Sequence, residues 1–232
     1  MIVSYAATRN LYEKMLPSIK SLLDHNDVER IYILCEDDDF PYEIPCDVIS
    51  INVSGQRIFN DINTHTCFTY MSLMRLLLAD LTSEERIIYL DCDTIILDDL
   101  TPIWTMDMDG KWWGAVEETQ GIYHPFGKHY YNAGVSVFNL KQMREDGAVK
   151  IMVDDLNRLN YRFPDQDILN KLCVPYKLAP IETRYNESFC CGQTKNPAII
   201  HYAGYGDWWE NPRTPRFEYL RRYKDNPPCP KA

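Results

Sequence analysis

The sequence predicts an α/β fold in which helices flank a mixed, mainly parallel β-sheet. Short apolar, β-prone segments alternate with segments of helical periodicity, and this alternation indicates crossover connections between parallel strands. The chain has 232 residues and contains no repeat, charge block or Pro/Gly/Ser-rich linker. We therefore expect one domain over residues 1–232 with a sizeable core.

The N-terminal half supplies four of the expected strands, at residues 2–6, 30–35, 47–52 and 87–91. The spacing of apolar residues predicts one helix around 15–23 and another around 71–81. Ligands of such sheets bind beyond the carboxyl ends of the strands. Because the segments 7–12 and 91–93 each follow a strand, we expect both on the same rim.

The C-terminal half continues the alternation, with strands expected at 113–118 and 131–140 and a short strand within 198–204 that ends in His201. One helix is expected over 143–159. Another is expected over 163–172, where Pro164 and acidic residues suit a first helical turn. The tail 211–224 is predicted to form a basic helix.

Composition excludes several classes of partner. A net charge of −10 does not attract a phosphate backbone or an anionic membrane surface, so no nucleic-acid partner is expected. The start has no basic segment or long apolar run, and no later segment approaches about 18 uninterrupted apolar residues. We expect a cytoplasmic protein without a transmembrane segment, whose eight scattered cysteines are reduced.

The segment IIYLDCDTIIL places Asp91 and Asp93 at the end of an apolar run. The spacing alone proves little, because Asp-x-Asp also occurs at 37–39, 107–109 and 165–167. In an extended chain the two carboxylates lie on one side, roughly 7 Å apart, and they need a cation or hydrogen-bond donors to neutralise them. Hard oxygen ligands favour Mg²⁺ or Mn²⁺. The alternative is two solvated carboxylates on a turn.

Several motifs occur together in one order along nearly the whole chain: AATRNLY near the N-terminus, Arg75 on a helix, YLDCDT, YNAGVSVFNL, DQDILN, RYN at 184–186 and HYAG at 201–204. This ordered set resembles the family 8 retaining glycosyltransferases, which include glycogenin and bacterial lipopolysaccharide galactosyl- and glucosyltransferases. The resemblance implies a GT-A-like nucleotide-sugar-binding fold. Residues 1–100 would form the nucleotide-binding half, 101–210 the donor-sugar and acceptor half, and 211–232 a C-terminal tail.

The resemblance implies that Asp91, Asp93 and His201 hold Mn²⁺, or Mg²⁺ in its place, against the diphosphate of a UDP-sugar, with Cys92 beside it. This agrees with the chemistry, because a cation stabilises the negative charge that develops on the leaving phosphate. A lone histidine at a strand end is often structural, which is the alternative for His201.

The resemblance also assigns a uridine-binding turn, with Tyr12 as the stacking candidate. The turn includes Ala7, Thr8 and Asn10. The alternative for Tyr12 is a helix-start aromatic residue packed on the core. Arg75 resembles the basic residue that approaches the first motif aspartate and the donor; its alternative is a solvated charge on an amphipathic helix.

Contacts to the donor sugar are implied for Asn132, Ala133 and Gly134, and a donor contact for Gly204. Asp165 and Gln166 match the catalytic pair beside the anomeric carbon. The alternative for Asp165 is a simple charge at a helix N-terminus. Both a double displacement and a same-face substitution remain open for the reaction.

The chain departs from the family pattern after His201, where it reads HYAGYGDWW. The family usually has a lysine followed by Pro-Trp there, whereas this chain has Asp207 at the lysine's place and Trp208 for the proline. Arg213 and Arg216 are candidates to supply the missing positive charge to the diphosphate.

The expected function is transfer of a hexose, glucose or galactose, from a UDP-sugar to a saccharide or other hydroxyl acceptor. The alternative is a catalytically weakened nucleotide-sugar-binding protein, motivated by Asp207. A metal-dependent phosphoesterase is a third interpretation, disfavoured because no second ligand cluster supplies a two-metal site. The acceptor and the oligomeric state are not legible from the sequence.

Overall fold

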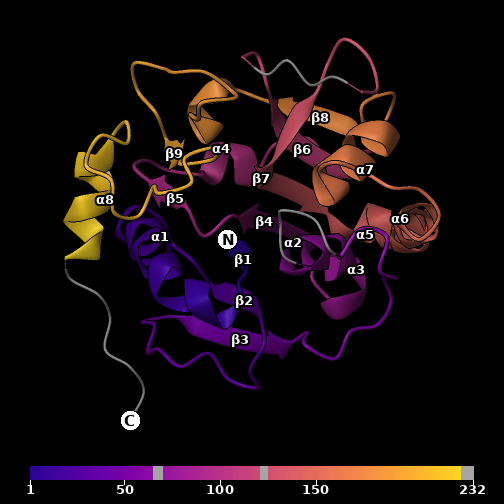
Figure 1. The fold of residues 1–232 in the computed structure, drawn as a ribbon, viewed down its shortest axis with the longest axis horizontal. Coiled ribbons are helices and arrows are strands. Elements are labelled where there is room, and N and C mark those ends of the chain that lie inside the picture. The colour runs from indigo at the N-terminus through magenta and orange to yellow at the C-terminus, as the bar shows by residue number, and fades with distance from the viewer. Residues whose placement is uncertain (65–69, 121–124, 226–232) are drawn as a thin grey trace.

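The computed structural model describes residues 1–64, 70–120 and 125–225. Its centre is a seven-stranded sheet in the order β3-β2-β1-β4-β7-β6-β8 (Figure 1). The strands are β1 (Ile2–Ala6), β2 (Arg30–Cys35), β3 (Asp47–Asn52), β4 (Arg86–Leu90), β6 (Trp113–Glu117), β7 (Tyr131–Asn139) and β8 (Leu178–Ile181). The four strands from β3 to β4 are parallel, β7 is antiparallel to both of its neighbours, and β8 is parallel to β6. The predicted mixed, mainly parallel sheet is confirmed.

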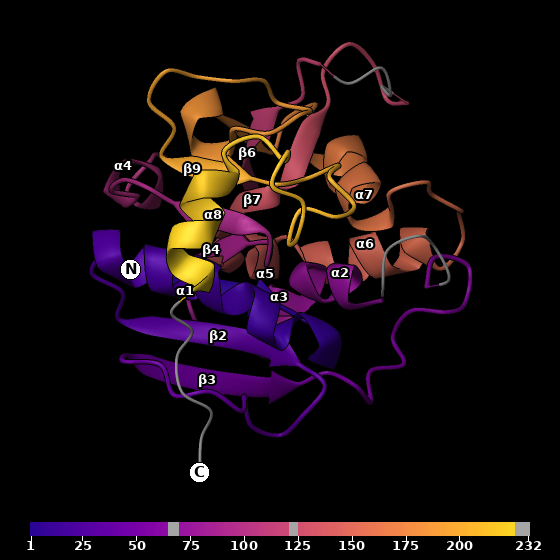
Figure 2. The same ribbon diagram turned by 60° about the vertical axis from the view of Figure 1, so that its left-hand side comes forward.

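Helices cover both faces of this sheet. They are α1 (Tyr12–His25), α2 (Met71–Met74), α3 (Leu78–Leu81), α4 (Thr101–Trp104), α5 (Leu140–Glu145), α6 (Ala148–Leu156), α7 (Pro164–Cys173) and α8 (Phe217–Lys224), with 3₁₀ turns η1 (Arg9–Leu11), η2 (Arg75–Leu77) and η3 (Thr183–Asn186). Helices α1 and α8 lie on one side, and α2, α3, α5, α6 and α7 lie on the other (Figures 1 and 2). No helix of the described ranges is both long and apolar enough to cross a bilayer.

Strand β1 shows how the two faces are built. Val3 and Tyr5 pack in the cluster that contains the apolar side of α1, whereas Ile2 and Ala6 pack in the cluster beneath α2 and α3. Successive side chains of a strand point to opposite faces, so a strand covered on both sides is mostly apolar, and in β1 only the Ser4 and Tyr5 hydroxyls depart from this. All five residues of β1 are buried accordingly.

Three predicted elements differ from the structure. The helix expected over 143–159 is divided into α5 and α6, because Gly147 adopts a left-handed conformation (φ +64°) that ends the first helix. The segment 71–81 is helical throughout but passes through the 3₁₀ turn η2. In the tail, only Phe217–Lys224 forms a helix.

Six of the eight cysteines lie in the described part of the chain, and all six are free, as expected. Cys67 and Cys229 lie outside the described residues.

A second, two-stranded sheet brings distant segments together at the rim. It pairs β5 (Thr94–Ile96) antiparallel with β9 (Ile199–His201). The register places His201 opposite Thr94, the residue that follows Asp93. This pairing brings the C-terminal histidine to the carboxyl end of β4.

Candidate active site

The Asp91-Cys92-Asp93 segment is a turn rather than the extended strand end that the sequence suggested. Strand β4 ends at Leu90 and β5 begins at Thr94. The Asp91 amide donates to the Gly134 carbonyl oxygen (2.8 Å), and the Thr94 hydroxyl donates to the Asp91 carbonyl oxygen (2.9 Å). The turn, and not the two-residue period of a strand, therefore sets the direction of the two carboxylates.

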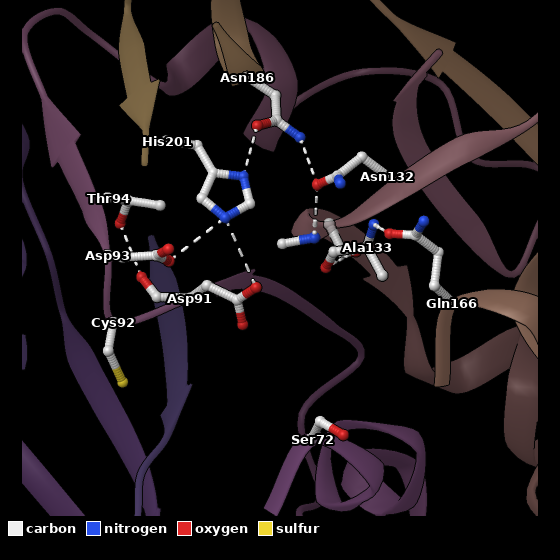
Figure 3. A network of polar contacts seen from close by, with 12 residues as sticks. Ser72, Asp91, Cys92, Asp93, Thr94, Asn132, Ala133, Gln166, Asn186 and His201 are labelled. Atoms are coloured by element: carbon white, nitrogen blue, oxygen red, sulfur yellow. Dashed lines mark hydrogen bonds and ion pairs between the residues drawn. The ribbon is translucent and has the colours of Figure 1, made fainter. Parts of the chain in front are cut away.

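Asp91, Asp93 and His201 converge in the way expected of a metal site (Figure 3). His201 Nε2 lies 3.2 Å from Asp93 Oδ1 and 3.7 Å from Asp91 Oδ2, and one ligand atom from each residue lies within 4.8 Å of the others. The histidine is only 3% exposed. Burial alone lowers the pKa of His201, but the Asp93 and Asp91 carboxylates outweigh burial and raise it. Two carboxylates and one imidazole form a donor set that fits a divalent cation.

Arg75 joins two of the predicted carboxylates. It is 4% exposed, and its guanidinium donates to Asp91 Oδ1 (2.8 Å) and the Ala133 carbonyl oxygen (2.8 Å) while lying 3.2 Å from Asp165 Oδ2. The guanidinium also stacks over the Tyr89 ring at 4.2 Å. The solvated-charge alternative for Arg75 therefore does not hold.

Asp165 is also buried, at the first turn of α7. Burial raises the pKa of Asp165, and the nearby Arg75 opposes that rise. The Asp165 carboxylate is therefore not a simple solvated charge at a helix N-terminus. It lines the same cavity as Asp91.

A chain of amides leads away from His201. His201 Nδ1 lies 2.8 Å from Asn186 Oδ1, Asn186 Nδ2 donates to Asn132 Oδ1 (2.9 Å), and Asn132 Nδ2 donates to Glu118 Oε1 (2.9 Å). The same Glu118 oxygen accepts a hydrogen bond from Gln166 Nε2 (3.1 Å). Glu118 and Asn186 were missed as site residues. Asn186 lies in the RYN motif without an assigned role, and nothing local in the sequence marks Glu118.

Two cavities meet at Asp91 and Asp93, and the third candidate ligand, His201, lines one of them. One, of about 310 Å³, is lined by the predicted sugar-side residues Asn132, Ala133, Gly134, Asp165, Gln166 and Gly204. The other, of about 290 Å³, extends toward the end of β1. Both are lined by Ser72, Arg75, Asp91 and Asp93, so the acidic turn stands where the two spaces join.

The predicted nucleotide segment lies at the second cavity, but the residue that lines it is Leu11. Tyr12 is 4% exposed; its ring packs against Phe40 and its hydroxyl donates to Asp37. This is the core position described by the alternative for Tyr12. The segment turns through η1, so the register of side chains shifts by one from the expected one.

The other predicted residues of this segment, Ala7, Thr8 and Asn10, form hydrogen bonds within the protein. Ala7 is buried and its amide donates to the Leu34 carbonyl oxygen (3.0 Å). The Thr8 hydroxyl donates to the exposed Asn10 side chain (2.5 Å). Cys92 lines the second cavity, and its buried thiol donates to the Ala6 carbonyl oxygen (3.4 Å), away from the carboxylates (Figure 3).

Arg213 and Arg216, the two arginines expected to supply the charge of the family lysine, differ in their exposure and in their partners. Arg213 is exposed. The Arg216 guanidinium pairs with the buried Glu187 (Nε to Oε1, 2.8 Å) and donates to the Thr194 carbonyl oxygen (3.0 Å). Asp207, at the lysine's place, is exposed and accepts a hydrogen bond from Asn211.

Known structures resemble this fold over almost its full length. The galactosyltransferase LgtC, solved in complex with donor and acceptor sugar analogues, matches with a TM-score of 0.74 at 21% identity, covering 97% of this chain and 95% of that one. The glycosyltransferase GlyE of Streptococcus pneumoniae matches with a TM-score of 0.74 at 22% identity, covering 96% of this chain and 59% of that one. At such identities the likeness shows the GT-A fold.

Sequence relatives are longer proteins. A probable glycosyl transferase Gly of Streptococcus gordonii is 26% identical over 82% of this chain and 30% of its own length. The glycosyltransferase GlyA of Streptococcus pneumoniae is 25% identical over 89% of this chain and 32% of its own length. The chain thus spans about a third of these two relatives. Residues 2–211 match Glycosyl transferase family 8 as a unit, and the chain belongs to this family.

Proposed function

We propose that this chain is a metal-dependent retaining transferase that moves a hexose from a UDP-sugar to a saccharide or other hydroxyl acceptor. The observation that carries the proposal is the junction of two cavities at Asp91 and Asp93, beside which His201 completes the donor set from the sugar-side cavity. A nucleotide sugar has a nucleoside at one end, a sugar at the other and a diphosphate between them. A cation held by these three side chains would lie where the diphosphate has to lie.

The bound cation, Mn²⁺ or Mg²⁺, would stabilise the charge that develops on the leaving diphosphate. The chain's own residues orient the rest. Arg75 holds the Asp91 and Asp165 carboxylates in place from one side. Gln166 is fixed by Glu118 and by the Ala133 amide, which donates to its Oε1 (2.9 Å).

Asp165 and Gln166 are proposed to stand beside the anomeric carbon. Both line the sugar-side cavity, which Asp91 and Asp93 also line. Nucleophilic attack by a side chain and a same-face substitution both remain compatible with this placement.

The second candidate is a nucleotide-sugar-binding protein with little turnover. It rests on Asp207, a negative charge next to Trp208. Trp208 lines the second cavity, the one that extends toward the end of β1. Both candidates predict binding of the donor, so only turnover separates them.

The test is a screen of UDP-sugars for Mn²⁺-dependent release of UDP, followed by mass spectrometry of the acceptor product. We expect Asp93→Ala to abolish this release while the protein stays folded, because the change removes a metal ligand and not a core contact. The matched control is Asp107→Ala, an exposed aspartate from another Asp-x-Asp pair. Normal Mn²⁺-dependent release by Asp93→Ala would refute the metal role, and binding without any release would favour the second candidate.

A further inference from the structure

We infer that Asn186 is a positioning residue that fixes the ring of His201 with its hydrogen on Nδ1, so that the Nε2 lone pair faces the metal site. The inference rests on the metal role in the proposed function, and it concerns residues to which that function gives no task. Asn186 lines neither of the two cavities; its side chain contacts His201 at one end and Asn132 at the other.

The orientation of the Asn132 and Asn186 side-chain amides is fixed by neighbouring groups that can only donate or only accept a hydrogen bond. The Gly134 backbone amide can only donate, and it donates to Asn132 at 3.0 Å, so the atom that receives it is Oδ1. The other end of the same amide faces Glu118, whose carboxylate can only accept when ionised, so that end is Nδ2. The orientation of Asn132 is therefore determined at both ends.

The orientation of Asn132 determines that of Asn186. Asn132 Oδ1 needs a donor from Asn186, which turns Nδ2 of Asn186 toward Asn132 and Oδ1 toward His201 (Figure 3). A side-chain carbonyl oxygen only accepts, so His201 Nδ1 has to carry the hydrogen. The nitrogen left for a metal is Nε2, which is the atom that lies between Asp91 and Asp93.

Burial makes this arrangement stiff. Asn132, Asn186 and His201 are all at most 6% exposed, so water does not compete for these hydrogen bonds. Metal-bound histidines generally donate from the other ring nitrogen to a protein acceptor, and loss of that acceptor typically lowers metal affinity about 10–100-fold. Here the acceptor is the side-chain amide of Asn186, which is itself oriented by Asn132 of β7.

The same carboxylate also orients Gln166, since Glu118 Oε1 accepts from both Asn132 and Gln166. The metal ligand and the side chain proposed beside the anomeric carbon thus have one common anchor. A disturbance at Asn186 should reach the histidine first and Gln166 only through Asn132.

The test measures Mn²⁺ affinity from the free-ion EPR signal, with Mn²⁺ alone and at a fixed UDP concentration. Asn186→Ala should bind Mn²⁺ about 10–100-fold more weakly than wild type. Asn186→Asp keeps an acceptor for Nδ1–H but loses the donor to Asn132 Oδ1, so it should bind Mn²⁺ more tightly than Asn186→Ala and more weakly than wild type. The matched control is Asn63→Ala: Asn63 is also buried and hydrogen-bonded, to the carbonyl oxygens of Leu156 and Leu159, but has no path to His201.

A second readout does not depend on metal loading or on a variant that folds. Spectra of ¹⁵N-histidine-labelled, metal-free wild type should show a protected Nδ1–H for His201. A ring protonated only at Nε2 would overturn the inference, as would wild-type Mn²⁺ affinity in a folded Asn186→Ala or equal losses in the Ala and Asp variants. If wild type binds no Mn²⁺ in either condition, the proposed function fails together with the inference; if it binds and Asn186→Ala does not differ, only the inference fails.

Discussion

Gly134 leaves the space that the candidate metal ligands His201 and Asp91 occupy, and replacing it with alanine is a direct steric test of the site. A Cβ at this position would lie 2.1 Å from His201 Cε1, 2.7 Å from His201 Nε2 and 2.7 Å from Asp91 Oδ2. Gly134 does not have a positive φ, so alanine meets no backbone strain there. The whole effect of Gly134→Ala therefore comes from contact with the two ligands.

The size of the required movement follows from these distances. Carbon atoms pack at about 3.5 Å or more, so the imidazole has to withdraw by about 1.4 Å. The pairing of β7 with β6 is interrupted at Gly134, but the backbone there is held by the Asp91 amide, which donates to the Gly134 carbonyl oxygen, and by Asn132 Oδ1, which accepts from the Gly134 amide. Metal–ligand distances tolerate only about 0.2 Å, so His201 ceases to be a ligand.

We expect Gly134→Ala to lower the Mn²⁺ affinity at least about 100-fold. This loss should exceed the one expected when a residue that only hydrogen-bonds to a metal ligand is removed. Overpacking should also lower the free energy of unfolding by about 1–3 kcal/mol. A chain of this size then melts about 2–4 °C lower per kcal/mol. Mn²⁺ titration, Mn²⁺-dependent UDP release and thermal unfolding measure the three effects.

The matched control is Gly114→Ala in the adjacent strand β6. Its Cβ would meet Val137 Cβ at 3.2 Å and Ile181 Cδ1 at 3.3 Å, which is tight but touches no ligand. This variant should lose some stability and keep its Mn²⁺ affinity. If Gly134→Ala binds Mn²⁺ like wild type, the His201 ring does not hold the metal where the structure puts it, and the argument for the site is wrong.

Three further predictions test other parts of the protein. In Mn²⁺, UDP should raise the melting temperature far more than ADP or GDP at equal concentration, since ligands that bind only the native state stabilise it; equal shifts would contradict a uridine donor. Arg216→Ala should lower the free energy of unfolding by about 1–3 kcal/mol, because the buried Glu187 carboxylate loses its cationic partner and keeps only its hydrogen bonds from Thr194, whereas Arg213→Ala should not, as chemical denaturation can show; equal stabilities would contradict a structural ion pair. Burial raises the pKa of Asp155, but its hydrogen bonds from Lys171 and Tyr161 outweigh burial and lower it. The stability that Asp155 contributes relative to Asp155→Asn should therefore be full above the unfolded pKa of about 3.9 and shrink as the pH falls through the lower folded value; a pH-independent difference in denaturation midpoint would refute this.

The parts of the fold that follow from local pattern were predictable. The strand β2 was predicted to the residue, because an apolar run between polar turns carries its own boundaries. The split at Gly147 was not predicted, since the apolar spacing of 143–159 continues across the glycine and only the backbone shows its left-handed conformation. Tyr12 was misplaced for a similar reason: the 3₁₀ turn η1 moves the next side chain inward, so that Leu11 reaches the cavity.

The residues of the candidate site also differ in whether a local sequence pattern predicts them. Asp91 and Asp93 stand out by themselves, because two acids directly after an apolar strand are unusual enough to need an explanation. His201 entered through the resemblance alone, and the reason is visible in the fold: its pairing with Thr94 joins segments that no local rule connects.

Glu118 shows the limit most clearly. In the sequence it is one acid beside another at a strand end, where a solvated charge is the ordinary expectation. Its role becomes visible only when three separate segments place Asn132, Gln166 and Asn186 around one another. Residues that orient such side chains are selected by the hydrogen-bonding needs of their neighbours in space. Sequence motifs therefore predict the candidate metal ligands, while the structure is needed to find the residues that orient them.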